Sequence, residues 1–273
     1  MGNSRSKRRL ETLGDSSILN EAFSLQGSNG CAVLLIHGWS SIPFEMRALG
    51  EHLQGKGYSV QAPLLTGHGT KPEDLEGLVW QDWQRDAFDA YQKLCQTHER
   101  VYVGGMSTGG SLALHVAKRF PDVAGLVLLG TPYGMRYEKI GFYLTRVLKN
   151  FWPYKKKYYP KILGSERGVS ELIAYDRYPY ASAYEALYAI KSATTQLGCV
   201  QAPCMIVQSR HDHLITKGSM TRLKRELSGS QVTTRMIDKA YHNFIADRKH
   251  SYIFEEISAF LERCEGHLSE QTT

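Results

Sequence analysis

A serine stands between two glycines in the segment Gly105-Met106-Ser107-Thr108-Gly109, after an apolar run and before a helical pattern. The Gly-x-Ser-x-Gly spacing alone is common, but a sharp strand-to-helix turn at this place would expose the Ser107 hydroxyl. Glycines two positions to either side remove side chains that would collide at such a turn. The following helix would direct N–H groups and a partial positive charge toward the hydroxyl. The segment therefore predicts a nucleophilic serine.

A serine hydroxyl needs a base to take its proton and an acid to orient that base. Asp212 follows the apolar run Cys204–Gln208, and His242 follows the run Val232–Ile237. Residues that follow parallel strands share one edge of the sheet, so both would lie on the same edge as Ser107. We predict that His242 is the base and Asp212 the acid. Asp238 is the alternative acid, because it also follows a strand.

Short apolar runs alternate with longer amphipathic segments from residue 31 onward. The runs that predict strands are Cys31–His37, Tyr58–Ala62, Val101–Met106, Val123–Leu129, Cys204–Gln208 and Val232–Ile237. The segments that predict helices are Pro43–Gln54, Trp80–Thr97, Thr108–Arg119, Lys217–Leu227 and Ile245–Arg263. This alternation is typical of an α/β fold with a mostly parallel, doubly wound sheet, and burial of both sheet faces explains the continuously apolar strands.

The alternation stops over residues 133–198, which are rich in tyrosine, tryptophan, lysine and arginine and have a helical periodicity. An insertion between parallel strands emerges at the carboxyl edge of the sheet, where ligands bind in such folds. We predict a helical cap over that edge. Its aromatic residues either line an apolar acyl pocket or form the core of the cap, and those expected to contact a substrate are Tyr133, Phe142 and Trp152. The run Lys155-Lys156-Lys157 is interpreted as a solvated turn, with attraction to anionic head groups or a membrane surface as the alternative.

Three further segments carry a family resemblance: His37-Gly38-Trp39 after the first strand, Gln208–His213 around the predicted acid, and Tyr241-His242-Asn243 around the predicted base. With them the chain resembles the α/β-hydrolase superfamily, and within it the small bacterial carboxylesterases and monoacylglycerol lipases with a short cap, over nearly the whole length. The resemblance implies an α/β-hydrolase fold in which the N–H groups of Trp39 and Thr108 form an oxyanion hole. Trp39 and Met106 are also expected to contact the substrate, and His37 to be a structural turn residue.

The same resemblance implies a serine carboxylic-ester hydrolase. It would act on short- to medium-chain acyl esters or monoglycerides through an acyl-enzyme on Ser107. A serine at this position disfavours the epoxide hydrolases and haloalkane dehalogenases, which would need an aspartate there. Thioester hydrolysis, acyl transfer and C–C cleavage by the same three residues remain alternatives. A ligand-binding protein without catalysis is a further alternative, since fold does not dictate function.

The composition is that of an ordinary globular protein, with 42% hydrophobic residues and a formal net charge of +6 over 273 residues. Much of the positive charge lies in Arg5–Arg9 and Lys149–Lys161 without any nucleic-acid-binding pattern, so no nucleic-acid partner is expected. No metal-ligand spacing or dinucleotide fingerprint is present, and we expect no metal and no cofactor. Five dispersed cysteines without a C-x-x-C pair favour a reducing compartment, and we expect a cytoplasmic protein.

The N-terminus differs from the rest of the chain. Residues 1–20 are predicted to be a disordered basic segment, followed by one α/β-hydrolase domain over residues 21–273. No apolar segment follows the basic residues Lys7-Arg8-Arg9, so a secretory signal is not expected. Met1-Gly2-Asn3-Ser4-Arg5-Ser6 matches the short N-myristoylation pattern, which is the alternative to a plain disordered start.

Overall fold

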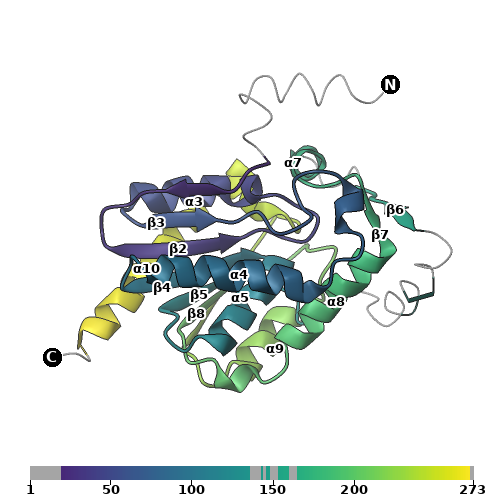
Figure 1. Cartoon of the computed structure of the whole chain (residues 1–273). Helices are drawn as coiled ribbons and strands as arrows, with labels where there is room; N and C mark the ends of the chain where they lie inside the picture. Colours follow the sequence, from purple (N-terminus) through teal and green to yellow (C-terminus); the bar gives the residue numbers. More distant parts are fainter. Residues whose placement is uncertain (1–19, 136–142, 144–145, 148–152, 160–164, 271–273) are drawn as a thin grey trace.

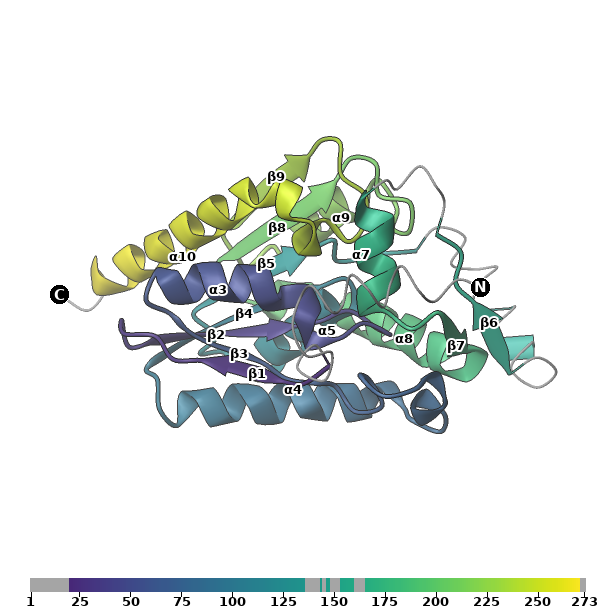
Figure 2. The ribbon, with the colours of Figure 1, turned by 90° about the horizontal axis from the view of Figure 1, so that it is seen from above.

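A seven-stranded sheet forms the centre of the protein, whose computed structural model describes residues 20–135, 143, 146–147, 153–159 and 165–270 (Figures 1 and 2). The strand order is β1-β3-β2-β4-β5-β8-β9. All neighbours are parallel except β1, which pairs antiparallel with β3 at one edge. The strands are β1 (Phe23–Leu25), β2 (Cys31–Ile36), β3 (Ser59–Ala62), β4 (Arg100–Met106), β5 (Gly125–Leu129), β8 (Cys204–Ser209) and β9 (Val232–Ile237).

Helices cover both faces of this sheet, as Figure 2 shows from above. The helices α3 (Arg47–Gly55) and α10 (Tyr252–Glu270) pack on one face. The other face is covered by α4 (Trp80–Cys95), α5 (Thr108–Arg119), α8 (Tyr180–Ala193) and α9 (Ser219–Glu226). The predicted doubly wound α/β architecture is therefore the one observed.

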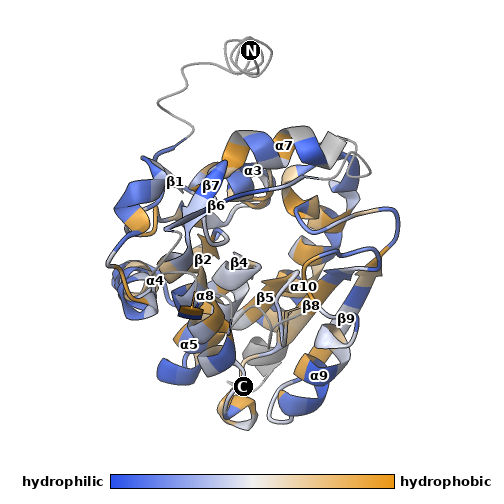
Figure 3. Ribbon diagram, turned by 90° about the vertical axis from the view of Figure 1, so that its right-hand side faces the viewer, coloured by the Kyte–Doolittle hydropathy of each residue, from blue (hydrophilic) through white to orange (hydrophobic). Residues whose placement is uncertain are grey.

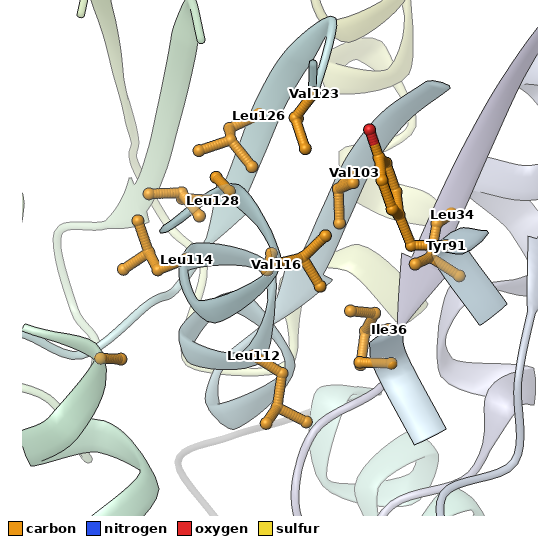
Figure 4. Close-up of a cluster of buried hydrophobic side chains, with 14 of the residues drawn as sticks. Leu34, Ile36, Tyr91, Val103, Leu112, Leu114, Val116, Val123, Leu126 and Leu128 are labelled. Carbon is orange, nitrogen blue, oxygen red and sulfur yellow. The ribbon is translucent and has the colours of Figure 1, made fainter. Parts of the chain in front are cut away.

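Alternation along each strand divides the core into two layers. Leu34 and Ile36 of β2 pack with α4 and α5, whereas Val33 and Leu35 point to the opposite face and pack with α3 and α10. Figure 4 shows the first layer, in which side chains of β2, β4 and β5 meet those of α5. Because successive side chains of a strand point to opposite faces and both faces are covered, every residue of β2 is buried. This double burial is the physical reason for the continuously apolar strands.

The insertion between β5 and β8 is not purely helical, contrary to the sequence prediction. Its described part contains the antiparallel strands β6 (Tyr154–Lys156) and β7 (Arg177–Pro179) and the helix α7 (Ser165–Ile173), at the end of the molecule that faces the viewer in Figure 3. The last helix of the predicted cap, α8, packs along α5 and α4 and belongs to the main body. Residues such as Lys155 and Tyr178 pair as strand neighbours that are far apart in the sequence, which no local periodicity reveals.

Most of the predicted elements are present with small shifts of their ends. The helix Thr108–Arg119 and the strand Val232–Ile237 have the predicted bounds. The C-terminal helix begins at Tyr252 rather than near Ile245, because two short 3-10 turns, Phe244–Ala246 and Arg248–His250, precede it. Strand β1 was not predicted; at three residues it is too short to show a period.

Residues 1–19, which hold the predicted disordered segment and the lipidation pattern, lie outside the described residues. Within the described ranges, no helix is both long and apolar enough to cross a membrane.

We expect Leu128→Ala to lower the free energy of unfolding by about 2–5 kcal/mol, because Leu128 is fully buried between β5 and α5 and its removal leaves a cavity. Leu214→Ala is the matched control. Leu214 is 40% exposed, and its truncation should change the free energy by less than about 0.5 kcal/mol. Urea unfolding followed by circular dichroism measures both, and equal effects of the two substitutions would contradict the assignment of this layer as core.

Candidate active site

Ser107 occupies a strained turn between β4 and α5. Its backbone has φ 54° and ψ −118°, a conformation that a residue with a side chain rarely adopts. Its N–H donates to the carbonyl of Leu129 at 2.8 Å, which fastens the turn to the neighbouring strand. A Cβ on Gly109 would lie 2.2 Å from the carbonyl oxygen of Ile36, and one on Gly105 would lie 2.3 Å from Gly109. The turn therefore tolerates no side chain at either glycine, as the sequence pattern predicted.

The N-terminus of α5 directly follows the Ser107 turn. The N–H groups of Gly110 and Ser111 donate to the carbonyl of Ser107 and so start the helix. Among the described residues, the N–H of Thr108 has no recorded acceptor. Thr108 thus offers a free donor next to the Ser107 hydroxyl, at the positive end of the helix dipole.

Asp212 and His242 form a buried pair. The Nδ1 atom of His242 lies 2.7 Å from Oδ2 of Asp212, and both side chains are almost fully enclosed. Oδ1 of the same carboxylate accepts the N–H groups of Leu214 at 2.8 Å and Ile215 at 3.0 Å. Burial by itself would raise the pKa of Asp212, but the imidazole and the two backbone donors outweigh it and lower the pKa below its ordinary value. The carboxylate is therefore charged at neutral pH and holds the ring with Nε2 pointing away from it.

Asp238, the alternative acid, lies elsewhere. Its side chain is 66% exposed and forms an ion pair with Arg210 at 2.5 Å. Arg210 is the cause of the lowered pKa of Asp238. The geometry thus brings Asp212, and not Asp238, to the imidazole of His242.

The pairing of the strands brings the histidine and the serine to one edge. Met106 pairs with Leu129, and Leu129 pairs with Val207, so β4, β5 and β8 end side by side. Gly130, the residue after Leu129, lies against the His242 ring, since a Cβ there would be 3.6 Å from Cε1 of His242. The imidazole therefore lies at the end of β5, directly beside the turn that holds Ser107.

The loop after β2 presents one backbone N–H group to the region around Ser107. The N–H of Gly38 is taken by Oε2 of Glu45 at 2.7 Å, and that of Ser40 by Nε2 of His68 at 2.9 Å. The N–H of Trp39 between them has no recorded acceptor among the described residues. A Cβ on Gly38 would lie 3.6 Å from Cβ of Ser107, so the loop passes directly over the serine. Trp39 thus has the free donor that the predicted oxyanion hole needs.

Two neutral histidines hold this loop from behind. Nε2 of His37 accepts the N–H of Leu65 at 3.2 Å, and Nε2 of His68 accepts that of Ser40, so each ring carries its proton on Nδ1 and donates to a carbonyl. Burial lowers the pKa of His37 to about 4 and that of His68 well below its ordinary value. His37 therefore has the geometry of the structural turn residue that was expected.

The residues predicted to contact a substrate have different surroundings. The Trp39 ring is half-buried, donates through Nε1 to Ser182 at 2.8 Å, and packs edge-on against Tyr178. Tyr133 is also half-buried and lies under the guanidinium of Arg222. Phe142 and Trp152 lie outside the described residues.

Met106 lies deeper than the other residues expected to contact a substrate. Its side chain has no exposed surface, belongs to the core layer under α3 and α10, and reaches the space beside Gly130 and the His242 ring. Its expected contact with a substrate stays a prediction.

Three side chains to which the sequence assigned no role in the site support it. Glu45 is 2% exposed and fixes Gly38, as described above. Asn243, next to His242, donates to Ser170 of α7 at 2.9 Å. Lys157 belongs to the predicted solvated turn, but its ammonium donates to the Ser40 hydroxyl, so the prediction is wrong for this residue. All three side chains look like ordinary surface residues in the sequence, and only the meeting of distant segments buries Glu45 and partly covers Asn243 and Lys157.

The family profile described as serine aminopeptidase S33 (Hydrolase_4) matches residues 28–249. The chain belongs to this family. The membership confirms the predicted resemblance to serine hydrolases with the α/β-hydrolase fold.

Several relatives align over nearly the full length of this S33-family protein. It is similar to a thermostable monoacylglycerol lipase from Bacillus sp. (strain H-257), 28% identical over 91% of this chain and 98% of that protein. A carboxylesterase from Bacillus subtilis (strain 168) is 25% identical over 88% of this chain and 96% of its own length. Among solved structures, one from work on LipS and LipT, two metagenome-derived lipolytic enzymes, superposes with a TM-score of 0.82 at 27% identity, covering 90% of this chain and 98% of the other.

We expect Asp212→Asn to lower kcat for p-nitrophenyl butyrate by roughly ten-thousandfold, because an amide cannot hold the imidazole in the tautomer that leaves Nε2 free to accept a proton. Asp238→Asn should leave kcat unchanged. Steady-state kinetics of the two purified variants make the comparison, and an equal loss in both would contradict the assignment of Asp212.

The buried histidines also make stability depend on pH. Burial lowers the pKa of His37 and of His115 to about 4 and that of His68 well below its ordinary value, whereas in the unfolded chain all three titrate near their ordinary value. The unfolded state therefore binds more protons as the pH falls below about 6.5, at up to about 1.4 kcal/mol per pH unit and group. We expect the free energy of unfolding to be at least about 2 kcal/mol lower at pH 5 than at pH 7.5.

Urea unfolding at the two pH values tests this expectation. His68→Gln should reduce the difference between them, and substitution of the exposed His211 by glutamine should not. An unchanged stability at pH 5 would show that these histidines are not buried in their neutral form.

Proposed function

We propose that this protein is a serine carboxylic-ester hydrolase in which Ser107, His242 and Asp212 form the catalytic triad. The observation that carries the proposal is the buried His242–Asp212 pair beside the strained Ser107 turn. A base with an oriented ring, a nucleophile on a helix N-terminus and two unclaimed backbone donors are the parts that acyl transfer requires.

The reaction begins when the Ser107 oxygen attacks the ester carbonyl while Nε2 of His242 takes its proton. The tetrahedral intermediate carries its negative charge on the former carbonyl oxygen, which the N–H groups of Trp39 and Thr108 stabilise. His242 then gives the proton to the departing alcohol, and the acyl group remains on Ser107. Water attacks this acyl-enzyme with His242 again as the base, and collapse of the second intermediate releases the acid and restores the serine.

The proposed substrates are short- to medium-chain acyl esters or monoglycerides. Full-length similarity to a monoacylglycerol lipase and a carboxylesterase supports this class. The half-buried Trp39 and Tyr133 are proposed to contact the acyl or alcohol portion, and they supply apolar surface close to the donors.

Two finer points remain predictions. The cap would touch a lipid surface transiently through exposed aromatic residues, of which Tyr143 is 70% and Tyr158 is 84% exposed. The second prediction is that the protein is located in the cytoplasm.

We expect Ser107→Ala to remove all turnover of a p-nitrophenyl series from acetate to decanoate, because loss of the nucleophile lowers kcat by about a millionfold. The unsubstituted protein should hydrolyse this series best at short or medium chain lengths and should react with a fluorophosphonate probe at Ser107. Ser111→Ala is the matched control. Ser111 lies one turn further along α5, and its hydroxyl has no hydrogen-bond partner among the described residues. Substantial hydrolysis by Ser107→Ala would identify a different nucleophile.

A further inference from the structure

Lys157 connects the inserted segment to the loop that carries the proposed oxyanion donor. It follows strand β6, and its own N–H donates to the carbonyl of Asp176 at 2.7 Å, which fixes its backbone. Its ammonium donates to the hydroxyl of Ser40 and lies 5.8 Å from the centre of the Trp39 ring. The Ser40 hydroxyl in turn donates to the carbonyl of Trp39 at 2.6 Å. One cation therefore contacts the Ser40 hydroxyl and the Trp39 ring, on the two residues that follow Gly38 in this loop.

Glu45 holds the same loop from the inside. Its buried carboxylate accepts the Gly38 N–H, and a buried charge needs compensation from its surroundings. Burial raises the pKa of this carboxyl, and the Gly38 N–H, the Ser41 hydroxyl, His242 and, from across the loop, Lys157 oppose that rise. The short segment Gly38–Ser40 thus lies between a buried anion and a cation that comes from the insertion.

We propose that Lys157 is a positioning residue that keeps the Trp39 N–H directed at the oxyanion, and that it does so only as an ammonium ion. This inference rests on the proposed function, since it assigns a support to the oxyanion hole of that reaction. A neutral amine would lose its attraction to the Trp39 ring and to the carboxylate of Glu45. The loop would then lose part of its hold, and the transition state would lose part of its stabilisation.

The surroundings of Lys157 place its titration within an accessible range. Burial lowers the pKa of Lys157 to about 8, although Glu45 and Asp176 both act to raise it. The other titratable groups that face this region are His68, which is neutral, and Tyr159, whose pKa burial raises. Neither His68 nor Tyr159 changes its charge between pH 7 and 9, whereas the ammonium of Lys157 titrates in that range.

The test is the pH dependence of kcat for p-nitrophenyl butyrate between pH 6 and 10. For the unsubstituted protein we expect kcat to fall as the pH rises through about 8. Lys157→Met keeps the aliphatic stem but removes the charge. It should lower kcat roughly tenfold at pH 7 with little change in KM, a smaller loss than the hundred- to thousandfold cost of removing a donor outright. Its kcat should also no longer fall above pH 8.

Further variants separate charge from bulk. Lys157→Arg keeps a cation that does not titrate, and it should restore kcat and extend the plateau above pH 9. Glu45→Gln keeps an acceptor for Gly38 but removes the anion that raises the pKa of Lys157, so the fall in kcat should begin at a lower pH. The control is Lys156→Met, which removes an exposed charge one residue earlier and should leave the whole profile unchanged.

The outcomes separate this inference from the proposed function. A wild-type kcat that does not fall between pH 7 and 9 overturns the role of Lys157 without need of any variant. A Lys157→Met protein with the kcat and pH profile of the wild type overturns it as well. Activity of Ser107→Ala, measured in parallel as the blank, would instead overturn the proposed triad.

Discussion

The strained backbone at Ser107 is the constraint on which the rest of the site depends. A positive φ at a residue with a side chain is unfavourable by roughly 1–3 kcal/mol, and it persists only because the surrounding structure holds it. Here the restraint comes from β5 through the Leu129 carbonyl and from β2 through the close approach of Ile36 to Gly109. The central strands and the turn are therefore packed as one unit, and the apolar layers on both sides of the sheet keep them so.

The loop after β2 is also held in place by its surroundings, through hydrogen bonds to its backbone N–H groups. The N–H groups of Gly38, Ser40 and Ser41 have fixed acceptors, which are a buried carboxylate, a neutral imidazole and the carbonyl of Gly38. A donor that is already oriented needs no reorganisation when negative charge develops beside it, and this is why preorganised donors stabilise transition states well. The acceptor Glu45 comes from the turn that follows the loop and His68 from a segment beyond β3, so the shape of the loop depends on packing and not on local turn preferences alone.

The inserted segment does more than cover the edge of the sheet. It contacts the oxyanion loop through Lys157 and through the N–H of Tyr175, which donates to the Ser40 carbonyl at 3.0 Å. It also contacts the histidine loop through the Ser170–Asn243 hydrogen bond. The two loops that would act on the substrate from opposite sides are thus held by the same insertion. Changes in the insertion should therefore alter the rate of the chemical step as well as the choice of substrate.

The sequence by itself determined the architecture and the central site residues. Continuous apolar runs indicated strands buried on both faces, and the glycines around Ser107 indicated the turn, because both patterns arise from local sterics and burial. The order of Ser107, Asp212 and His242 was sufficient to place them on one edge. Only the tertiary structure decided which aspartate meets the imidazole, which way Met106 points, and that Glu45 is enclosed and Lys157 partly buried. Those outcomes depend on contacts between segments far apart in the chain, and burial of a charged side chain has no local signal, since it becomes favourable only when its partners arrive.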